Sequence, residues 1–285
     1  YPFITELDAI LKSNPPASFG QYNNGLKLGG AKITIDGSVQ GRTALFTTPY
    51  LVEGPNGEKP WKGVAPFTQQ QLNQMVKQVY DLGLPLDLHA NGDGAIDMLL
   101  AAHEFAAAGD LEKERHVTAV HSQFVRRDQL DKYRKYKITP SFFTQHTYFF
   151  ADTHLVLRGK QQTDFISPMR TAIDMGLRPS NHTDFVVTPL DQLFVIWTAV
   201  NRLSRDGVLI GGDERITPLE ALQAITLSAA RQHGDEQTKG SLEHGKLADM
   251  VILSANPLTV EPMQIKDIKV VETFKQGRRI YPQQL

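Results

Sequence analysis

The sequence predicts an α/β fold in which a parallel sheet carries polar side chains along one edge. Short apolar runs that resemble strands alternate with helical stretches at intervals of roughly 30 residues, which is typical of βαβ units. Four of these runs contain or end in a residue that could serve a metal site: Lys32, His89, His121 and Asp184. Because parallel strands of an α/β barrel end at the same rim, we expect these four side chains to converge.

The predicted elements follow in regular order. Strands are expected near 30–35, 86–89, 117–121, 138–143 and 177–184, after a short helical pattern over 4–11. Helices are expected over 69–82, 95–108, 127–135 and 163–175, and a long Gly-, Pro-, Thr- and Asn-rich loop over 37–66. Thr68 suits the N-cap of the first helix, and Gly176 should end the last. A closed barrel needs more strands than these, so the sequence predicts a barrel segment.

The pattern changes after Asp184. Helices are predicted over 192–202 and 218–232, followed by strands at 248–254, 268–274 and 278–281 that are joined as hairpins. Thr217 and Pro218 are typical of a helix start. We therefore predict that 1–235 is the C-terminal part of a (β/α)8 TIM barrel and that 236–285 is part of a small β-sandwich domain.

Composition excludes several kinds of protein. The 285 residues carry 30 basic and 31 acidic side chains, a net charge of -1, so no basic surplus suggests a nucleic-acid partner. No apolar run approaches the roughly 18 residues that span a bilayer, so we expect no membrane partner. Cysteine is absent, which excludes disulfides and thiolate metal sites. A cytoplasmic location fits these features.

The chemistry of the four residues fits a site in which a metal ion activates water. Imidazole and carboxylate groups bind zinc and related divalent ions, and a metal lowers the pKa of its water to about 7. Asp184 could bind the metal or carry a proton from that water to a leaving amine. Lys32 could bind only as a carbamate, after carboxylation. Taken singly, each residue also fits a structural role, as a buried histidine, a solvated lysine or a turn aspartate.

Five segments together resemble the metal-dependent amidohydrolase superfamily. Within it, the chain is similar to amidohydrolase family 3, the group of N-substituted formamide deformylases and YtcJ-like hydrolases. The resemblance rests on residues 32–43, 89–95, 115–123, 182–191 and 239–249. It implies that Lys32 is the carboxylated lysine of barrel strand four, that His89 and His121 are metal ligands on strands five and six, and that Asp184 is the strand-eight ligand or general base. One or two zinc ions would be the cofactor.

The resemblance also assigns residues around the metal. His146 and His182 are expected to act with Asp184 in catalysis, in substrate binding or in polarising the transition state. Arg42 and His146 are the predicted substrate-binding residues, and Asp93 is a weaker candidate. The implied reaction is hydrolysis of a non-peptide, amide-type carbon–nitrogen bond in a small molecule by metal-activated water.

The chain departs from the family pattern at its start. The His-x-His motif of strand one and the first half of the β-domain are not found, so we expect the C-terminal half of a longer enzyme. Its expected partners are the missing N-terminal half and, in a homodimer, a second copy. Two alternatives stay open: a non-catalytic half-barrel that acts through partner binding or oligomerisation, and a metal-free aldolase with a Schiff base on Lys32.

Overall fold

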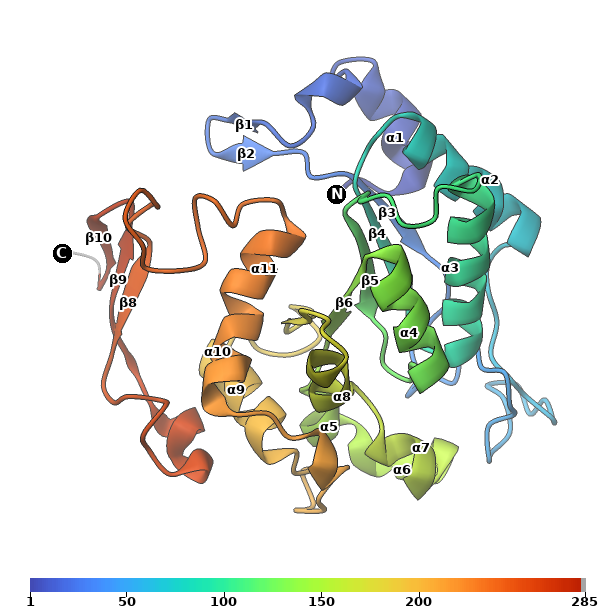
Figure 1. The fold of residues 1–285 in the computed structure, drawn as a ribbon. Helices are drawn as coiled ribbons and strands as arrows, with labels where there is room; N and C mark the ends of the chain where they lie inside the picture. Colours follow the sequence, from blue (N-terminus) through green and yellow to red (C-terminus); the bar gives the residue numbers. More distant parts are fainter. Residues whose placement is uncertain (283–285) are drawn as a thin grey trace.

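The computed structural model describes residues 1–282, and its centre is a five-stranded parallel sheet in the order β3-β4-β5-β6-β7 (Figure 1). Its strands are β3 (Ala31–Thr34), β4 (Leu86–Ala90), β5 (Val117–His121), β6 (Ile138–Phe142) and β7 (Ser180–Asn181). Spatial order follows chain order, as successive βαβ units require. The predicted parallel α/β sheet is confirmed. Within residues 1–282 the sheet does not close, so the barrel segment stays a prediction.

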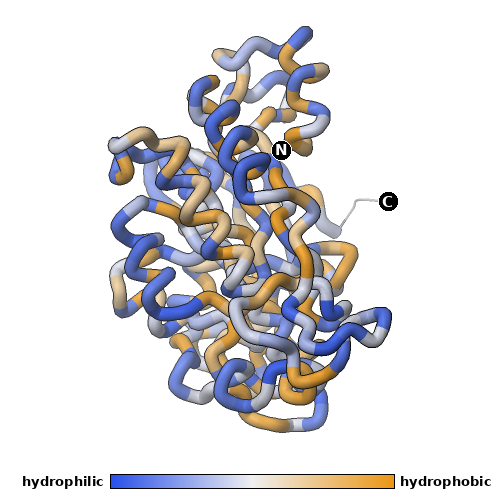
Figure 2. The backbone as a smooth tube through the Cα atoms, turned by 90° about the vertical axis from the view of Figure 1, so that its right-hand side faces the viewer, coloured by the Kyte–Doolittle hydropathy of each residue, from blue (hydrophilic) through white to orange (hydrophobic). Residues whose placement is uncertain are grey.

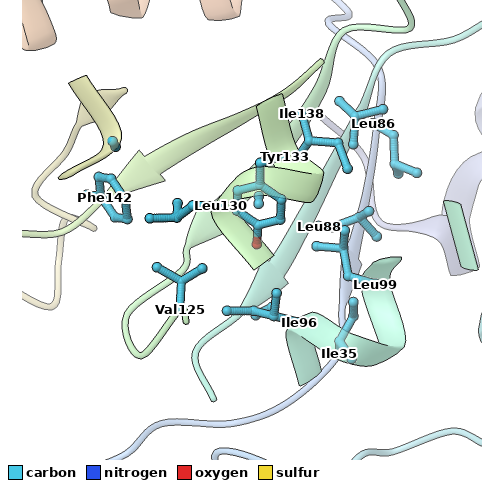
Figure 3. Packing of buried hydrophobic residues seen from close by; sticks show 14 of the residues in the cluster. Ile35, Leu86, Leu88, Ile96, Leu99, Val125, Leu130, Tyr133, Ile138 and Phe142 are labelled. Atoms are coloured by element: carbon cyan, nitrogen blue, oxygen red, sulfur yellow. The ribbon is translucent and has the colours of Figure 1, made fainter. Parts of the chain in front are cut away.

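Helices cover one face of this sheet. In β4, Leu86, Leu88 and Ala90 alternate with Asp87 and His89, and successive side chains on a strand point to opposite faces. The apolar set packs against α2 (Gln69–Asp81), α3 (Asp93–Ala106) and α4 (Arg127–Tyr136). Along the helices, hydrophilic and hydrophobic segments alternate (Figure 2), as expected for helices with one buried face. Figure 3 shows the core that results, with Ile35, Leu86, Leu88, Ile96, Leu99, Val125, Leu130, Tyr133, Ile138 and Phe142.

The N-terminal residues cover the outer edge of β3. Phe3 forms a parallel bridge with Lys32, and the backbone N–H of Lys32 donates to the carbonyl of Pro2 (2.8 Å). The Tyr1 ring lies so close to Gly29 that an added Cβ would approach it to 2.2 Å. The first three residues therefore occupy the place of a further strand beside β3.

The second half of the chain contains helices and then an antiparallel sheet, as predicted. Helices α9 (Gln192–Asn201), α10 (Pro218–Ile225) and α11 (Leu227–Gln232) precede β8 (Met250–Leu253), β9 (Val270–Lys275) and β10 (Arg278–Tyr281). The three strands form a separate sheet, far from α2 and α3 (Figure 1). The domain division after residue 235 stays a prediction, and the last three residues of the predicted small domain lie outside the described part.

The remaining elements are short. They are α1 (Ile4–Leu11), η1 (Pro16–Ser18), β1 (Tyr22–Asn23), β2 (Leu26–Lys27), α5 (His146–Phe149), α6 (Ala151–Arg158), α7 (Lys160–Asp164), α8 (Met169–Asp174), η2 (Gly212–Glu214) and η3 (Pro262–Asp267). None of the helices in residues 1–282 combines the length and the apolar character needed to cross a membrane.

The helix predicted over 163–175 is wrong in extent. The structure has two helices there, α7 and α8, separated by a connection that ends at Pro168. Ser167 has a φ of 43°, outside the right-handed helical region, and a residue before proline is disfavoured in that region in any case. Gly176, with a φ of 82°, follows α8 closely, as predicted.

Two further predictions need correction in length. The helix predicted over 218–232 breaks at Thr226, whose φ of -121° and ψ of -85° interrupt the helix between α10 and α11. The strand predicted over 177–184 shrinks to β7. Pro179 lacks the N–H that a longer strand would use in pairing, which accounts for the late start of β7.

Buried His103 in α3 should make the chain less stable in mild acid. Its Nε2–H donates to the Leu111 carbonyl (3.0 Å), so Nδ1 of the neutral ring accepts from the Tyr80 hydroxyl (2.8 Å). Burial lowers the pKa of His103 from its ordinary value of 6.5. The unfolded chain therefore binds more protons below that value, and the free energy of unfolding should fall as the pH drops from about 7 to about 5.

Urea unfolding at both pH values measures this loss of stability. His103→Gln keeps one donor and one acceptor but does not titrate, so it should lose less stability than the wild type. His244 is exposed, and His244→Gln should lose as much as the wild type. An equal loss in His103→Gln and the wild type would contradict the prediction.

Candidate metal centre

Two predicted ligands, His89 and His121, face each other at the end of the sheet. Their ring centroids are 4.5 Å apart and the planes meet at 81°. Strand alternation alone would place His121 with Val117 and Ala119, which belong to the apolar core. The φ of His121 is 71°, a left-handed conformation that breaks the alternation, and its ring lies against His89 instead. Such a backbone costs energy and is found preferentially at functional sites.

Asp184 and Lys32 complete the group of four. Asp184 Oδ2 lies 4.0 Å from His121 Nε2, and the Asp184 side chain is 44% exposed. Its φ is 49°, so two members of this site have left-handed backbones. Burial lowers the pKa of Lys32, against the opposing effect of the carboxylates of Asp87 and Asp184. The Lys32 ammonium in turn opposes the rise that burial causes in the pKa of Asp184.

Burial keeps the histidines neutral. It lowers the pKa of His89 to about 4, with a further contribution from Lys32, and it lowers the pKa of His182 to about 3. The pKa of His121 is held well below its usual value by burial and then by His89 and His182. A neutral imidazole offers a lone pair to a metal, whereas a protonated one does not.

A chain of stacked and edge-on rings links His121 to His146. The His182 ring lies 5.0 Å from His121 and stacks on Phe143 at 5.1 Å, and Phe143 meets His146 edge-on at 4.6 Å. His146 Nδ1 lies 3.0 Å from Nε2 of His154, a residue that the sequence did not single out. The structure therefore brings His146 and His182 to the predicted centre, while their catalytic roles stay a prediction.

The buried carboxylate of Asp36 lies next to His89 and binds three backbone N–H groups. It accepts hydrogen bonds from the backbone N–H groups of Leu45, Asn91 and Gly92, each 2.9 Å long. Its Oδ1 lies 3.6 Å from His89 Nε2. Burial raises the pKa of Asp36 to about 7, although the N–H donors oppose this. Asp36 directly follows a predicted strand, so its position in the sequence was a usable signal.

The side chains of Arg42 and Asp93 are engaged in hydrogen bonds with other protein groups. The guanidinium of Arg42 donates to the carbonyls of Glu53 (3.0 Å) and Gly54 (3.3 Å), within the loop over 37–66. Asp93 accepts from Arg126 Nη1 at 2.9 Å and from the backbone N–H of Thr47 at 2.9 Å. A role of Arg42 in substrate binding stays a prediction.

The donor set fits part of a metal shell. The buried Nδ1 of His121 and Nε2 of His182 have no hydrogen-bond partner in the described residues, which is unusual for buried polar atoms. Together with His89 and the Asp184 carboxylate, they supply the ligand types that divalent zinc prefers. Within residues 1–282, however, no three His, Cys, Asp or Glu side chains form a ready metal-binding group. The assignment of Lys32, His89, His121 and Asp184 as ligands therefore stays a prediction.

Comparison with known proteins identifies the family. A sequence profile described as the amidohydrolase family matches residues 9–281. The chain belongs to the amidohydrolase family. This membership confirms the resemblance that the five segments indicated. The amidohydrolase profile extends through the antiparallel sheet at the C-terminal end as well as the central sheet.

Three curated relatives are longer than this amidohydrolase chain. It is 30% identical to the Protein LONG AFTER FAR-RED 3 of Arabidopsis thaliana over 260 residues, 90% of this chain and 43% of that protein. It is 25% identical to the Putative amidohydrolase YtcJ of Bacillus subtilis over 90% of this chain and 47% of the relative. It is 24% identical to the N-substituted formamide deformylase of Arthrobacter pascens over 88% of this chain and 45% of the relative. The chain thus spans less than half the length of these relatives.

Solved structures agree on the fold. An uncharacterized metal-dependent hydrolase from Pyrococcus horikoshii OT3 has a TM-score of 0.76 and 25% identity over 91% of this chain and 50% of its own. The amidohydrolase chain described here is therefore similar in fold to metal-dependent hydrolases, and a divalent metal is the cofactor that this family implies.

Proposed function

We propose that this chain is the C-terminal part of a TIM-barrel enzyme, with barrel strands four to eight, that hydrolyses a non-peptide carbon–nitrogen bond. The observation that carries the proposal is the convergence of His89, His121 and Asp184 at one end of the parallel sheet, with ring centroids 4.5 Å apart and a carboxylate 4.0 Å from an imidazole nitrogen. Family membership and the hydrolase-like fold support it.

Different side chains would bind the metal and transfer the proton. His89, His121, His182 and the Asp184 carboxylate would hold one or two divalent ions, with zinc favoured by this donor set. When bound, such an ion acidifies water and polarises a carbonyl oxygen. The half-exposed Asp184 would accept the proton of the attacking water and deliver it to the leaving amine. The lowered pKa of Lys32 favours its neutral amine, the form that can take up carbon dioxide and become a ligand.

A second candidate is a non-catalytic half-barrel. The lack of a ready group of three donors within residues 1–282 favours it. It predicts that the purified chain holds no metal tightly, whereas the hydrolase proposal predicts binding that depends on the residues of the centre. The missing N-terminal half and a second copy would then be the partners.

Metal analysis tests the proposal. The chain is loaded with zinc, desalted and analysed by mass spectrometry, and then compared with His89→Ala and Asp184→Ala. Each substitution should weaken zinc binding by roughly 10-fold or more, because a directly bound ligand is lost. The exposed residues His244 and Asp206 provide matched controls, and their alanine variants should bind zinc like the wild type.

Hydrolysis is assayed first on N-substituted formamides, the class named in one relative. Retained metal and retained hydrolysis in both His89→Ala and Asp184→Ala would overturn the hydrolase proposal. Failure of the wild-type chain itself to bind zinc would favour the non-catalytic half-barrel.

A further inference from the structure

Two buried histidines form a direct hydrogen bond next to the candidate centre. His146 Nδ1 lies 3.0 Å from His154 Nε2, the two ring centroids are 5.3 Å apart, and the ring planes are inclined by 20°. His146 is the first residue of α5 and His154 lies in α6, so the pair joins two short helices. His154 is fully buried and has no contact with the predicted metal ligands among the described ring pairs.

Only one proton can lie between the two rings. A neutral imidazole has one N–H and one lone pair, so one ring must donate and the other accept. Burial lowers the pKa of His154 to about 3 and holds that of His146 well below its usual value, so both rings are neutral near neutral pH. The direction of the bond therefore fixes the tautomer of both rings.

The far side of His154 indicates the direction. Its Nδ1 is buried and has no hydrogen-bond partner within residues 1–282. If His146 were the donor, His154 would carry its proton on Nδ1, as a buried N–H without an oxygen or nitrogen acceptor. The neighbouring aromatic rings, Phe124 edge-on with its centroid 5.4 Å from that of His154 and Phe150 at 6.4 Å, offer at most a ring face, which is a weak acceptor. With His154 as the donor, the unpaired group is merely a lone pair.

We propose that His154 is a positioning residue that donates from Nε2 to His146 Nδ1 and so holds His146 as the Nε2–H tautomer. His146 then has its remaining N–H free to donate. No protein group hydrogen-bonds His146 Nε2 in the described residues, and this nitrogen is not among their fully buried unpaired atoms.

The free N–H of His146 is placed to meet a substrate oxygen. His146 contacts Phe143, which stacks on His182, and His182 lies beside His121. A donor at this place suits the carbonyl oxygen of an amide-type substrate, and the hydrogen bond strengthens as negative charge develops on that oxygen. This role rests on the proposed hydrolase, whereas the tautomer itself does not.

Nuclear magnetic resonance of 15N-histidine-labelled chain tests the tautomer directly. The His146 signals are identified by their loss in His146→Gln. In the wild type, His146 should show a protonated Nε2 and an unprotonated Nδ1. In His154→Phe, which keeps the ring shape but offers no donor, this preference should be lost. In His154→Gln, whose amide can donate, it should return. A wild-type His146 protonated on Nδ1 would overturn the proposal, even if His154→Phe failed to fold.

Two further readouts separate positioning from general stability. His103→Gln changes a different buried histidine, one with hydrogen bonds at both ring nitrogens, and should leave the His146 tautomer unchanged. In the zinc-loaded chain, His154→Phe should lower kcat by roughly 10-fold or more with zinc content retained, and His154→Gln should recover part of the loss. Equal kcat in all three proteins would contradict the role in hydrolysis but leave the tautomer result standing. Zinc binding by His89→Ala tests the proposed hydrolase and does not bear on the His146 tautomer.

Discussion

Replacing Arg202 with methionine should lower the free energy of unfolding by about 3–4 kcal/mol, near the upper end of single substitutions. Arg202 is fully buried at the C-terminal end of α9, with a φ of 52°. Its guanidinium donates to backbone carbonyls of Ile210 (2.7 Å), Ile166 (2.8 Å), Ser167 (3.2 Å) and Asp164 (3.3 Å). It thus joins the α7–α8 connection to the segment after α9.

The expected loss comes from the carbonyls that remain. Methionine fills similar space but donates nothing, so these carbonyls would lose the only side-chain donor that they have among residues 1–282. Burial lowers the pKa of Arg202 to about 10, which still leaves it charged at neutral pH. Urea unfolding measures the effect, with the exposed Arg134→Met as the control, for which we expect a change of less than about 0.5 kcal/mol. A similar small change in Arg202→Met would show that these contacts do not stabilise the fold.

Replacing Asp36 with alanine should both destabilise the chain by about 3 kcal/mol and weaken metal binding. The carboxylate satisfies buried N–H groups of Leu45, Asn91 and Gly92, which belong to the long loop and to the turn between β4 and α3. An added Cβ at Gly92 would come within 2.0 Å of the Leu45 carbonyl, so loop and turn are already in close contact. Without Asp36, this junction beside His89 should loosen.

Asp36→Asn provides a sharper comparison. It keeps the shape but turns one acceptor oxygen into a donor that faces a backbone N–H, so we expect an intermediate loss of stability. Denaturation and zinc titration of both variants measure the two effects, with the exposed Asp206→Ala as the control. If Asp36→Ala were destabilised but bound zinc with wild-type affinity, the predicted link between this junction and the metal centre would be wrong.

The sequence predicted the parts of the fold that have clear periodicity. Thr68 is the N-cap of helix α2, as predicted: its hydroxyl accepts from the Gln71 N–H while the Gln71 side chain accepts from the Thr68 N–H. The strands that end near His89 and His121 also agree with the prediction. Helices α5 and α6 were not predicted, because α5 has only four residues and α6 eight, which leaves little apolar spacing to recognise.

Only part of the candidate site could be predicted from the sequence. Residues at strand ends could be found because position in a βαβ unit fixes which edge they reach. His154 could not, since its importance comes from one hydrogen bond to His146 across two short helices. The left-handed backbones of His121 and Asp184 were equally hidden, because neither residue type requires that conformation.

The coverage of β3 by the first three residues has a consequence for self-association. An unpaired edge strand can form hydrogen bonds with a strand of a second copy, and this is a common route to aggregation. A strand from a second copy that paired with β3 would first have to displace Phe3 from its bridge with Lys32. It would also have to break the hydrogen bond from the Lys32 N–H to the Pro2 carbonyl. Proline also has no N–H to offer to an incoming chain. Removing residues 1–3 should therefore promote aggregation of the protein, which light scattering would measure.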